Sequence, residues 1–336
     1  MKSDNQGMKR NIALLAGGFS GEYAVSMKSA ETIRANMDVE LFDCHLLEIK
    51  RDTWSVLRDN EKIKVDLDDF SFDSGQGRIK FDYAYIIIHG TPGEDGRLQG
   101  YLEMKGVPYS TGPVLNTALT FSKVATQRLL KSNGLAVADH MIVTAENRPE
   151  AEEIASRLGL PCFVKPSESG SSLGVSKVKL TEAMDTAIDH ALEFSSEVII
   201  ESFLDGRELA CGVLRTAEGV QALPVTEIIA QSDFFDYKAK YEDEATREET
   251  PAAISDDATM RCQELSRQVY ELTGCDGIAR VDFFICGEEL FIVEVNTVPG
   301  MSKESIVPKQ LRAVGIDLKE YITWKISTDI AKKGIK

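Results

Sequence analysis

The chain reads IARVDFFICGEELFIVEVNTVPG from Ile278 to Gly300, and this stretch has the most informative pattern in the sequence. Two apolar runs flank the turn residues Gly287-Glu288-Glu289, a pattern that predicts a β-hairpin. Successive side chains of a strand point to opposite faces. We therefore expect Arg280, Asp282 and Phe284 to share one face of the first strand.

The second strand of this hairpin carries Glu294 and Asn296 on one face. With Asp282 they make three oxygen-bearing side chains, and a site without Cys or His suits Mg²⁺, which keeps water ligands and bridges to phosphates. The alternative is a half-buried hairpin with a charged outer face. Surface strands rarely place Asp, Glu and Asn inside apolar runs this dense. We therefore predict a Mg²⁺ site at Asp282, Glu294 and Asn296, beside Arg280.

Length and composition limit the class of protein. A chain of 336 residues accommodates two or three structural units. The net charge of −16 argues against a nucleic acid or an anionic membrane as partner. The six cysteines form no C-x-x-C pair, which indicates free thiols in a reducing compartment. No apolar run reaches about 18 residues, and the N-terminus lacks a signal peptide's apolar core. We expect a soluble cytoplasmic protein.

The first third of the chain has the pattern of a nucleotide-type α/β unit. An apolar run at 11–16 is followed by Gly17-Gly18 and then by a helical stretch to about Met37. A complete G-x-G-x-x-G is absent, so dinucleotide binding is not indicated. Glu22 precedes the helix, where it could receive a substrate ammonium. A helix-capping role is the alternative for Glu22.

Two further strands are predicted at 40–49 and 83–88, with a helix around 98–105. The sequence HGTPGEDG at 89–96 lies between the second strand and that helix. His89 falls at the carboxyl end of the strand, where open α/β sheets place ligands. A neutral histidine with satisfied hydrogen bonds is the alternative. Residues 108–112 form a predicted linker.

The middle third contains a predicted helix at 114–132 and an apolar strand, PCFVKP, at 161–166. Lys165 interrupts this strand, and a buried lysine is costly unless it meets an anion. We expect a phosphate to be that partner. The Gly- and Ser-rich segment 167–177 follows, and its N–H groups could wrap a phosphate. Another apolar strand, 197–201, ends at Glu201.

The last third begins with predicted strands at 208–214 and 220–229. The polar stretch 231–250 contains aromatic residues and lysines, which favours a lid that closes over a ligand. An amphipathic helix at 257–273 precedes the hairpin. Helices at about 308–314 and 317–332 complete the chain.

The motifs of this chain resemble those of the D-alanine–D-alanine ligases, which are ATP-grasp enzymes. They occur in the family's order: G-G-x-S-x-E, H-G-x-x-G-E-D-G, K-P-x-x-x-G-S-S-x-G, a Lys-Tyr lid, and R-x-D with E-x-N-x-x-P-G. The resemblance extends over about residues 11–330. It implies a three-domain α/β ATP-grasp architecture: a Rossmann-like domain 1–111, a central domain 112–201, and a C-terminal domain 202–336 with the lid 231–250. ATP would be clamped between the second and third domains.

The resemblance also assigns the nucleotide and metal sites. Lysines would contact the ATP phosphates, residues 201–204 the adenine and Glu208 the ribose, while Lys240 in the lid would reach the γ-phosphate. The implied nucleotide residues are Lys123, Lys165, Ser172, Glu201, Ser202, Phe203, Leu204, Glu208 and Lys240. The metal would be Mg²⁺, as two ions, with Mn²⁺ able to replace it.

Two D-alanines would be the amino-acid substrates. Glu22 would contact the ammonium of the first D-alanine and form a hydrogen-bonded triad with Ser171 and Tyr241. Arg280 would stabilise the developing oxyanion. His89 would contribute to the substrate site. The carboxylate of the second D-alanine would be held by the implied residues Gly300, Ser305 and Ile306, the last through its backbone.

Two positions depart from the family pattern. Ala24 stands where the family usually has a second glutamate, and Ser122 stands where it has an aspartate before the phosphate-contacting lysine. The second glutamate is not tied to catalysis by the resemblance. Neither departure removes a residue assigned above.

The expected reaction is ATP-dependent formation of D-alanyl-D-alanine through an acyl phosphate, for peptidoglycan precursor synthesis. A D-alanine–D-lactate or D-alanine–D-serine ligase is the alternative within the class, although Tyr241 argues against both. A non-catalytic ATP-grasp nucleotide-binding regulator is the alternative outside it, and the intact metal trio and lysines argue against that. The family implies a homodimer whose ligands are ATP and D-alanine, with no nucleic acid or membrane partner.

Overall fold

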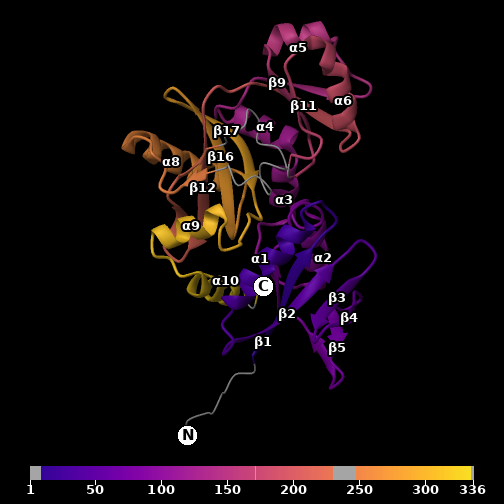
Figure 1. Ribbon diagram of the computed structural model, residues 1–336. Helices are drawn as coiled ribbons and strands as arrows, with labels where there is room; N and C mark the ends of the chain where they lie inside the picture. The colour runs from indigo at the N-terminus through magenta and orange to yellow at the C-terminus, as the bar shows by residue number, and fades with distance from the viewer. Residues whose placement is uncertain (1–8, 171, 230–246, 334–336) are drawn as a thin grey trace.

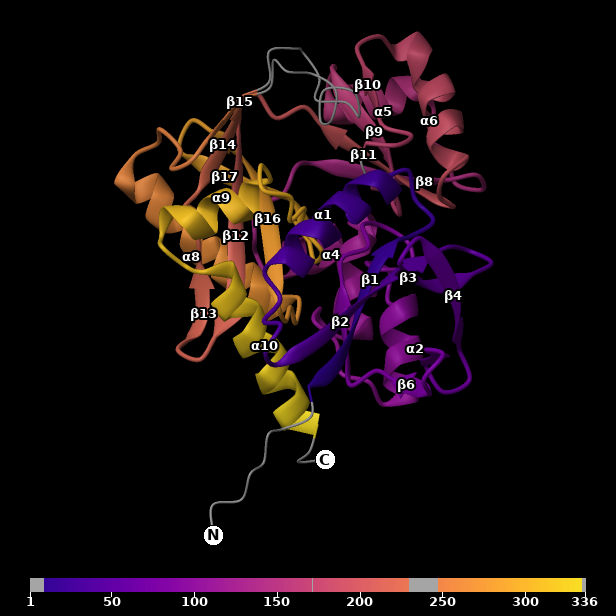
Figure 2. The ribbon, with the colours of Figure 1, turned by 60° about the horizontal axis from the view of Figure 1, so that its bottom comes forward.

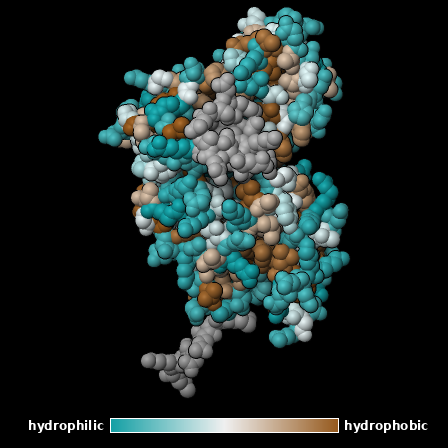
Figure 3. Space-filling model, viewed as in Figure 1, coloured by the Kyte–Doolittle hydropathy of each residue, from teal (hydrophilic) through white to brown (hydrophobic). Residues whose placement is uncertain are grey.

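The computed structural model describes residues 9–170, 172–229 and 247–333. These residues form three β-sheets, each with its own helices (Figure 1). The strands of the first sheet lie within residues 10–86, those of the second within 140–202, and those of the third within 207–296. On the face shown in Figure 3 hydrophilic residues predominate, in keeping with the high net charge.

The first sheet is built around β1 (Arg10–Gly17), which lies between β2 (Phe42–Ile49) and β7 (Tyr83–Ile86). These three strands are parallel. Beyond β2 the sheet continues as an antiparallel meander of β3 (Trp54–Arg58), β4 (Glu61–Asp66), β5 (Ser71–Asp73) and β6 (Arg78–Lys80). Helices α1 (Tyr23–Ala35) and α2 (Arg97–Lys105) follow β1 and β7. The carboxyl ends of β1 and β7 are therefore adjacent.

Two helices, not one, occupy the predicted helix at 114–132. They are α3 (Val114–Phe121) and α4 (Lys123–Ser132). Ser122 separates them because its backbone is extended, with ψ at 109°, and its hydroxyl accepts the N–H of Ala125 as the N-cap of α4. This break makes Lys123 the first residue of α4. Helix α4 contacts both β11 (Glu197–Ser202) of the second sheet and β17 (Glu289–Asn296) of the third.

The second sheet has the order β10-β9-β11-β8 and is antiparallel. Its strands are β8 (His140–Thr144), β9 (Cys162–Pro166), β10 (Ser176–Val178) and β11 (Glu197–Ser202). Helices α5 (Ala151–Leu158) and α6 (Met184–Leu192) cover it, with a short 3₁₀ turn at Thr181–Ala183. Its core is a separate cluster that includes Val164, Ile188 and Val198.

The third sheet has the order β15-β14-β12-β16-β17, and β13 also pairs with β12. Its strands are β12 (Arg207–Thr216), β13 (Gly219–Ala222), β14 (Thr226–Ile229), β15 (Arg247–Glu249), β16 (Ile278–Cys286) and β17 (Glu289–Asn296). The strand predicted at 220–229 is divided, since Pro224 lies between β13 and β14 and cannot donate to the ladder. Helix α8 (Asp256–Leu272) packs on β12, β13 and β16.

The last two helices are α9 (Ile306–Ala313) and α10 (Leu318–Lys333). Helix α10 returns to the first sheet: Tyr321, Ile322 and Ile326 belong to the same buried cluster as the strands β1, β2 and β7 (Figure 2). Tyr83 of β7 also donates a hydrogen bond to Asp329 at 2.8 Å. The end of the chain thus packs against its beginning. The domain boundaries given above stay a prediction.

Candidate active site

The hairpin β16–β17 brings the predicted metal cluster together. Arg280 is paired across the strands with Asn296, and Asp282 with Glu294, so these four side chains share one face as expected. A β-bulge follows Asp282 and changes the register beyond it. Arg280 donates two hydrogen bonds of 2.7 Å to the carboxylate of Asp282. Asn296 donates to Asp282 at 3.0 Å and to Glu294 at 3.5 Å.

The donors of this cluster suit a hard divalent cation. They comprise two carboxylates and one amide, and Mg²⁺ prefers such oxygen ligands. Within the residues that the structure describes, no three His, Cys, Asp or Glu side chains group closely enough to hold a metal by themselves. A cation here would therefore rely on the amide oxygen of Asn296, on water and on phosphate oxygens. The residues fit Mg²⁺ bound together with a nucleotide.

Lys165 lies beside this cluster, and the structure gives it a protein anion as partner, in addition to which the phosphate contact stays a prediction. It forms an ion pair with Glu201, across the β9–β11 pairing. Burial alone would lower the pKa of Lys165, but the carboxylates of Glu201, Glu294 and Glu208 raise it above its ordinary value. A carboxylate thus offsets the burial of this lysine in the structure. Gln127 of α4 donates to Glu201 at 3.1 Å and to the carbonyl of Val293 at 3.2 Å.

Aromatic residues lie next to this ion pair at the end of the second sheet. The rings of Phe163 and Phe203 have centroids 6.2 Å apart. Lys177 lies with Nζ 4.4 Å from the centroid of Phe203. Phe203 is partly exposed, and Ser202 is fixed by donating its N–H to the carbonyl of Asp139 at 2.8 Å. Phe163 and Lys177 are not among the predicted site residues, and Phe163 has no sequence signature beyond an apolar position in a strand.

The predicted adenine segment continues from β11 into β12. Glu201 is buried at the end of β11, Leu204 is half-buried in the connection, and Glu208 is half-buried near the start of β12. Glu208 is paired with Phe284 of β16. A strip of residues from 201 to 208 therefore runs from the second sheet to the third, past the aromatic pair.

The Gly- and Ser-rich loop approaches both Lys123 and the first unit. Lys123 donates from Nζ to the carbonyl of Ser169 at 2.7 Å. A Cβ added to Gly170 would lie 2.7 Å from the Glu22 carboxylate, so the backbone and Glu22 are in close approach there. Ser172 adopts a positive φ of 58° in this loop. Ser171, between them, lies outside the described residues, as do Lys240, Tyr241 and residues 231–246 of the predicted lid.

Glu22 and His89 lie at the adjacent carboxyl ends of β1 and β7. Glu22 occupies the N-cap position of α1 without a side-chain capping bond, and it is 8% exposed. His89 donates from Nδ1 to the carbonyl of Val298 at 2.7 Å. Burial lowers the pKa of His89, which keeps the ring neutral, so Nε2 carries a lone pair. Nε2 is buried and has no hydrogen-bond partner among the residues described.

Glu94 is a half-buried acid of the HGTPGEDG motif, and no role was predicted for it from the sequence. It accepts the N–H of Gly90 at 2.7 Å and the N–H of Val298 at 3.2 Å. Burial raises the pKa of Glu94 to about 8, and the charges of Glu22 and Glu294 add to the rise. The bond to Val298 joins the first unit to the segment that follows the hairpin of the third sheet.

Residues 297–305, which we call the acceptor loop, connect β17 to α9. Ser305 is the N-cap of α9, and its hydroxyl lies 2.8 Å from that of Ser302. Ile306 is the first residue of α9, and the first N–H groups of a helix lack acceptors within it. A Cβ on Gly300 would lie 3.1 Å from the Ser305 hydroxyl. The structure thus brings Gly300, Ser305 and Ile306 together at the N-terminus of α9, and helix N-termini favour anions.

Two family models match this chain. The model described as "D-ala D-ala ligase N-terminus" matches residues 11–112, and "D-ala D-ala ligase C-terminus" matches residues 129–326. A Bacteroides fragilis protein named D-alanine–D-alanine ligase is 44% identical over 318 residues, covering 94% of this chain and 98% of that protein. The Porphyromonas gingivalis protein of the same name is 45% identical over 314 residues, covering 93% and 95%.

This chain also resembles solved structures, at lower sequence identity. The VanG D-Ala:D-Ser ligase from Enterococcus faecalis superposes with a TM-score of 0.84 at 31% identity, covering 95% of this chain and 99% of that one. The D-alanyl-alanine synthetase A from Vibrio cholerae superposes with a TM-score of 0.87 at 25% identity, covering 97% and 100%. Both similarities extend over nearly the entire chain.

Proposed function

The chain belongs to the D-alanine–D-alanine ligase family, and we propose on that premise how its side chains are shared among the steps of the reaction. The protein is an ATP-dependent ligase with the predicted ATP-grasp architecture, and it forms D-alanyl-D-alanine for peptidoglycan. The observation that carries the assignment is the face shared by Arg280, Asp282, Glu294 and Asn296. That face adjoins Lys165, whose pKa responds to Glu294.

The nucleotide would lie between the second and third sheets. Lys123, Lys165 and Lys240 would neutralise its phosphates, with Ser172 beside them. Residues Glu201, Ser202, Phe203 and Leu204 would face the adenine, and Glu208 the ribose. The ring pair of Phe163 and Phe203 supports this orientation, because apolar faces pack against a flat base. Binding of the triphosphate would give Lys165 an anion to contact in addition to Glu201.

Asp282, Glu294 and Asn296 would hold the metal. Mg²⁺ bound there would neutralise phosphate charge, and we extend the proposal to two ions and to replacement by Mn²⁺. Arg280 now pairs with Asp282 through two hydrogen bonds. A cation held by Asp282 would compete with this guanidinium for the carboxylate, and Arg280 would then interact with the substrate from the position that the pairing gives it.

The first D-alanine would bind between Glu22 and Arg280. Glu22 would receive its ammonium, as part of the proposed triad with Ser171 and Tyr241, and the bare Nε2 of His89 offers a further acceptor. A carboxylate oxygen of this substrate attacks the γ-phosphorus, and ADP leaves. The product is an acyl phosphate. Positioning and neutralisation of charge carry most of this step.

The second D-alanine would bind at the acceptor loop. Its carboxylate would meet the hydroxyl of Ser305 and the N–H of Ile306, close to Gly300. Its amine then attacks the acyl carbonyl, and the oxyanion develops beside Arg280. Collapse of the tetrahedral intermediate expels phosphate, the amine loses a proton, and the peptide bond is formed.

D-alanine is the acceptor that we propose, although one neighbour in fold is a D-Ala:D-Ser ligase. The relatives of 41–45% identity all carry the name D-alanine–D-alanine ligase, which favours D-alanine over D-serine or D-lactate. The complete set of metal-binding and phosphate-binding side chains in the sequence opposes a non-catalytic regulator.

Release of ADP tests the proposed function directly. We expect ADP and D-alanyl-D-alanine to form when ATP, Mg²⁺ and D-alanine are supplied. Adding D-serine or D-lactate to limiting D-alanine should yield little mixed product. ADP release that ignores D-alanine, or a mixed product as the main one, would rule out the assignment.

We also propose that the protein acts as a homodimer in the cytoplasm, where ATP is available. Its six cysteines are all free, as expected in a reducing compartment. Across the described part of the chain, no helix is both long and apolar enough to cross a bilayer. Light scattering that gives the mass of one chain at working concentration would contradict the dimer.

A further inference from the structure

Both backbone polar groups of Val298, in the acceptor loop, form hydrogen bonds with side chains of the first unit. Its N–H donates to Glu94 at 3.2 Å, and its carbonyl accepts from His89 at 2.7 Å. Three residues further on, the N–H of Met301 donates to the hydroxyl of Ser29 at 3.2 Å. Glu94, His89 and Ser29 all lie in the first unit, on α1 or on the segment between β7 and α2. The acceptor loop therefore takes its position from side chains of another part of the molecule.

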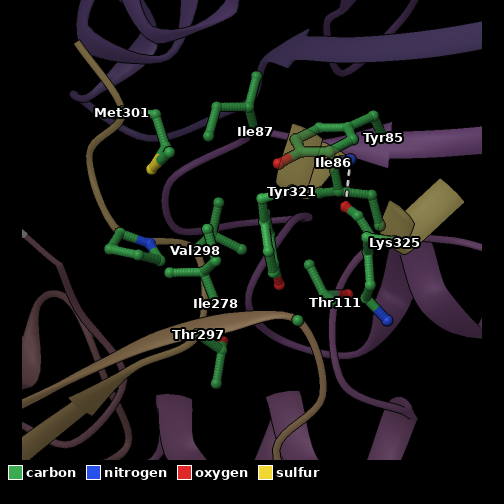
Figure 4. Close-up of a pocket in the computed structure, with 13 residues that line it drawn as sticks. Tyr85, Ile86, Ile87, Thr111, Ile278, Thr297, Val298, Met301, Tyr321 and Lys325 are labelled. Carbon is green, nitrogen blue, oxygen red and sulfur yellow. Dashed lines mark hydrogen bonds between the residues drawn. The ribbon is translucent and has the colours of Figure 1, made fainter. Parts of the chain in front are cut away.

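Packing behind the loop is incomplete. A cavity of about 30 Å³ lies between the acceptor loop, the end of β7 and α10, which is room for about two water molecules. Figure 4 shows Thr297, Val298 and Met301 around the same space as Tyr321 and Lys325. The Tyr321 hydroxyl is buried and has no hydrogen-bond partner within the described chain. Val298 and Met301 belong to the buried cluster that α10 joins, so the bonds from the first unit act together with this packing to position the loop.

We propose that Glu94 is a positioning residue for the acceptor substrate, acting through the backbone of Val298. The inference rests on the proposed function, because the acceptor loop leads directly to Gly300, Ser305 and Ile306. A carboxylate is suited to this place because both of its partners are N–H donors, Gly90 and Val298. Loss of one bond would let the loop relax toward the cavity and move the carboxylate-binding groups.

The effect is expected to fall on the acceptor and not on the donor. Of the groups proposed for the first D-alanine, Glu22 at the N-cap of α1 and Arg280 in β16 lie outside the acceptor loop. His89 does contact the loop, and Glu94→Gln removes no group that His89 contacts. In Glu94→Gln the amide nitrogen would face one of the two N–H donors, so at least one hydrogen bond is lost while the side-chain shape is kept. Above pH 8, where Glu94 is ionised, the charge-assisted bond that is lost corresponds to about a tenfold or greater rise in the acceptor's Michaelis constant, so the kinetics are measured at about pH 9.

The experiment measures initial rates over a wide range of D-alanine concentrations and fits a Michaelis constant for each D-alanine. Glu94→Gln should raise the second constant and leave the first and the ATP constant near their wild-type values. Ser29→Ala, which removes the acceptor for Met301 N–H, should raise the second constant by a smaller factor. It also keeps the test available if Glu94→Gln does not fold, as judged by thermal unfolding.

Asp95→Asn is the matched control, since it makes the same change one residue along. The Asp95 side chain bonds to Thr91 and Arg97 within its own loop and does not reach the acceptor loop. We expect no selective rise in the acceptor constant for this variant. The inference is overturned if both constants of a Glu94 or Ser29 variant rise together, or if only kcat falls. A wild-type protein without D-alanine-dependent ADP release would instead refute the proposed function.

Discussion

Gly170 illustrates how a single backbone position can control the donor site. A Cβ at this position would lie 2.7 Å from Oε2 of Glu22, and the same oxygen lies 3.8 Å from a Cβ added at Gly90. Because Oε2 is the end of a flexible side chain, it can move aside at small cost to the fold. The displaced carboxylate would no longer face the position proposed for the substrate ammonium.

We therefore predict that Gly170→Ala raises the Michaelis constant of the first D-alanine by about tenfold to a hundredfold, because misplacement of a binding group weakens alignment. The thermal unfolding midpoint should change little. Gly100→Ala in α2 is the control, since a Cβ there would be 3.9 Å from its nearest neighbour. Equal donor constants in the two variants would argue against a contact between Glu22 and the donor.

Individual residues also show the limits of reading the sequence. The shared face of Arg280, Asp282, Glu294 and Asn296 could be predicted because a strand's alternation is a local property, and the register of the hairpin confirmed that face; metal binding there stays a prediction. The ion pair of Lys165 with Glu201 could not be predicted, because Glu201 lies 36 residues away and strand pairing alone brings it near; the phosphate contact of Lys165 stays a prediction. Glu94 was missed because its role depends on Val298, which is 204 residues distant.

At the level of elements, the break between α3 and α4 has a function that a continuous helix would not provide. Ser122 caps α4 and also lies 3.1 Å from the hydroxyl of Ser167, at the start of the Gly- and Ser-rich loop. It therefore fixes Lys123 against the loop that this lysine contacts. This chain has Ser122 where the family usually has aspartate. The N-cap is kept, because serine and aspartate are both good N-cap residues.

Ser122→Ala should lower the free energy of unfolding by about 1 kcal/mol, the usual cost of losing an N-cap. We also expect a higher Michaelis constant for ATP, since Lys123 loses its anchored position. Denaturant titration and steady-state kinetics measure the two effects. Ser132→Ala at the exposed end of the same helix is the control. A Ser122 variant indistinguishable from that control would contradict the argument.

Elements were predicted well where the pattern is local and less well where distant contacts decide. The hairpin and α8 follow from period-two and helical spacing, and both were found near the predicted bounds. The division of 114–132 depends on the contact of Ser122 with Ser167, which the local pattern does not contain. The division of 220–229 could have been read from Pro224.

At the level of the whole molecule, a buried ion cluster joins α10 to the first and third sheets. Lys325 is 3% exposed at its side chain and lies 2.8 Å from Asp329 and 3.2 Å from Asp276. Asp329 also accepts from Tyr83 of β7, and Asp276 precedes β16. One ammonium thus holds together the two parts that face each other across the substrate site.

Lys325→Met should lower the free energy of unfolding by about 3–5 kcal/mol, because it leaves the buried carboxylate of Asp329 without its nearest cation and also removes the pairing with the half-buried Asp276. Lys332→Met is the matched control: this lysine is exposed and lies 3.8 Å from the same Asp329, so its loss should cost less than about 1 kcal/mol. Denaturant titration of the two variants checks the prediction. Similar losses in both would show that the buried cluster is not what joins α10.

The pH dependence of stability should show the titration of Glu94. Its pKa in the folded protein is about 8, against a usual 4.5, so the folded state holds this proton more tightly than the unfolded state. Between these values the folded state binds more protons, and its stability therefore falls as pH rises, by up to about 1.4 kcal/mol per pH unit. Glu94→Gln lacks this titration.

The free energy of unfolding of the wild type minus that of Glu94→Gln should therefore decrease from pH 5 to pH 8. Denaturant titrations without nucleotide or Mg²⁺ measure it, since the neighbouring carboxylates Glu22 and Glu294 are then free of ligands. A difference that is constant over this range, or that grows, would show that Glu94 is ionised throughout.

The proposed function requires that the hairpin β16–β17 bind the nucleotide through a metal ion. The direct test is the affinity for ATP, measured by calorimetry with and without Mg²⁺. Mg²⁺ should tighten ATP binding in the wild type and in Glu289→Gln, a change at an exposed residue of the same strand. In Glu294→Gln that gain should be lost while the thermal unfolding midpoint is retained. The same gain in Glu294→Gln as in the wild type would contradict the assignment of the metal site.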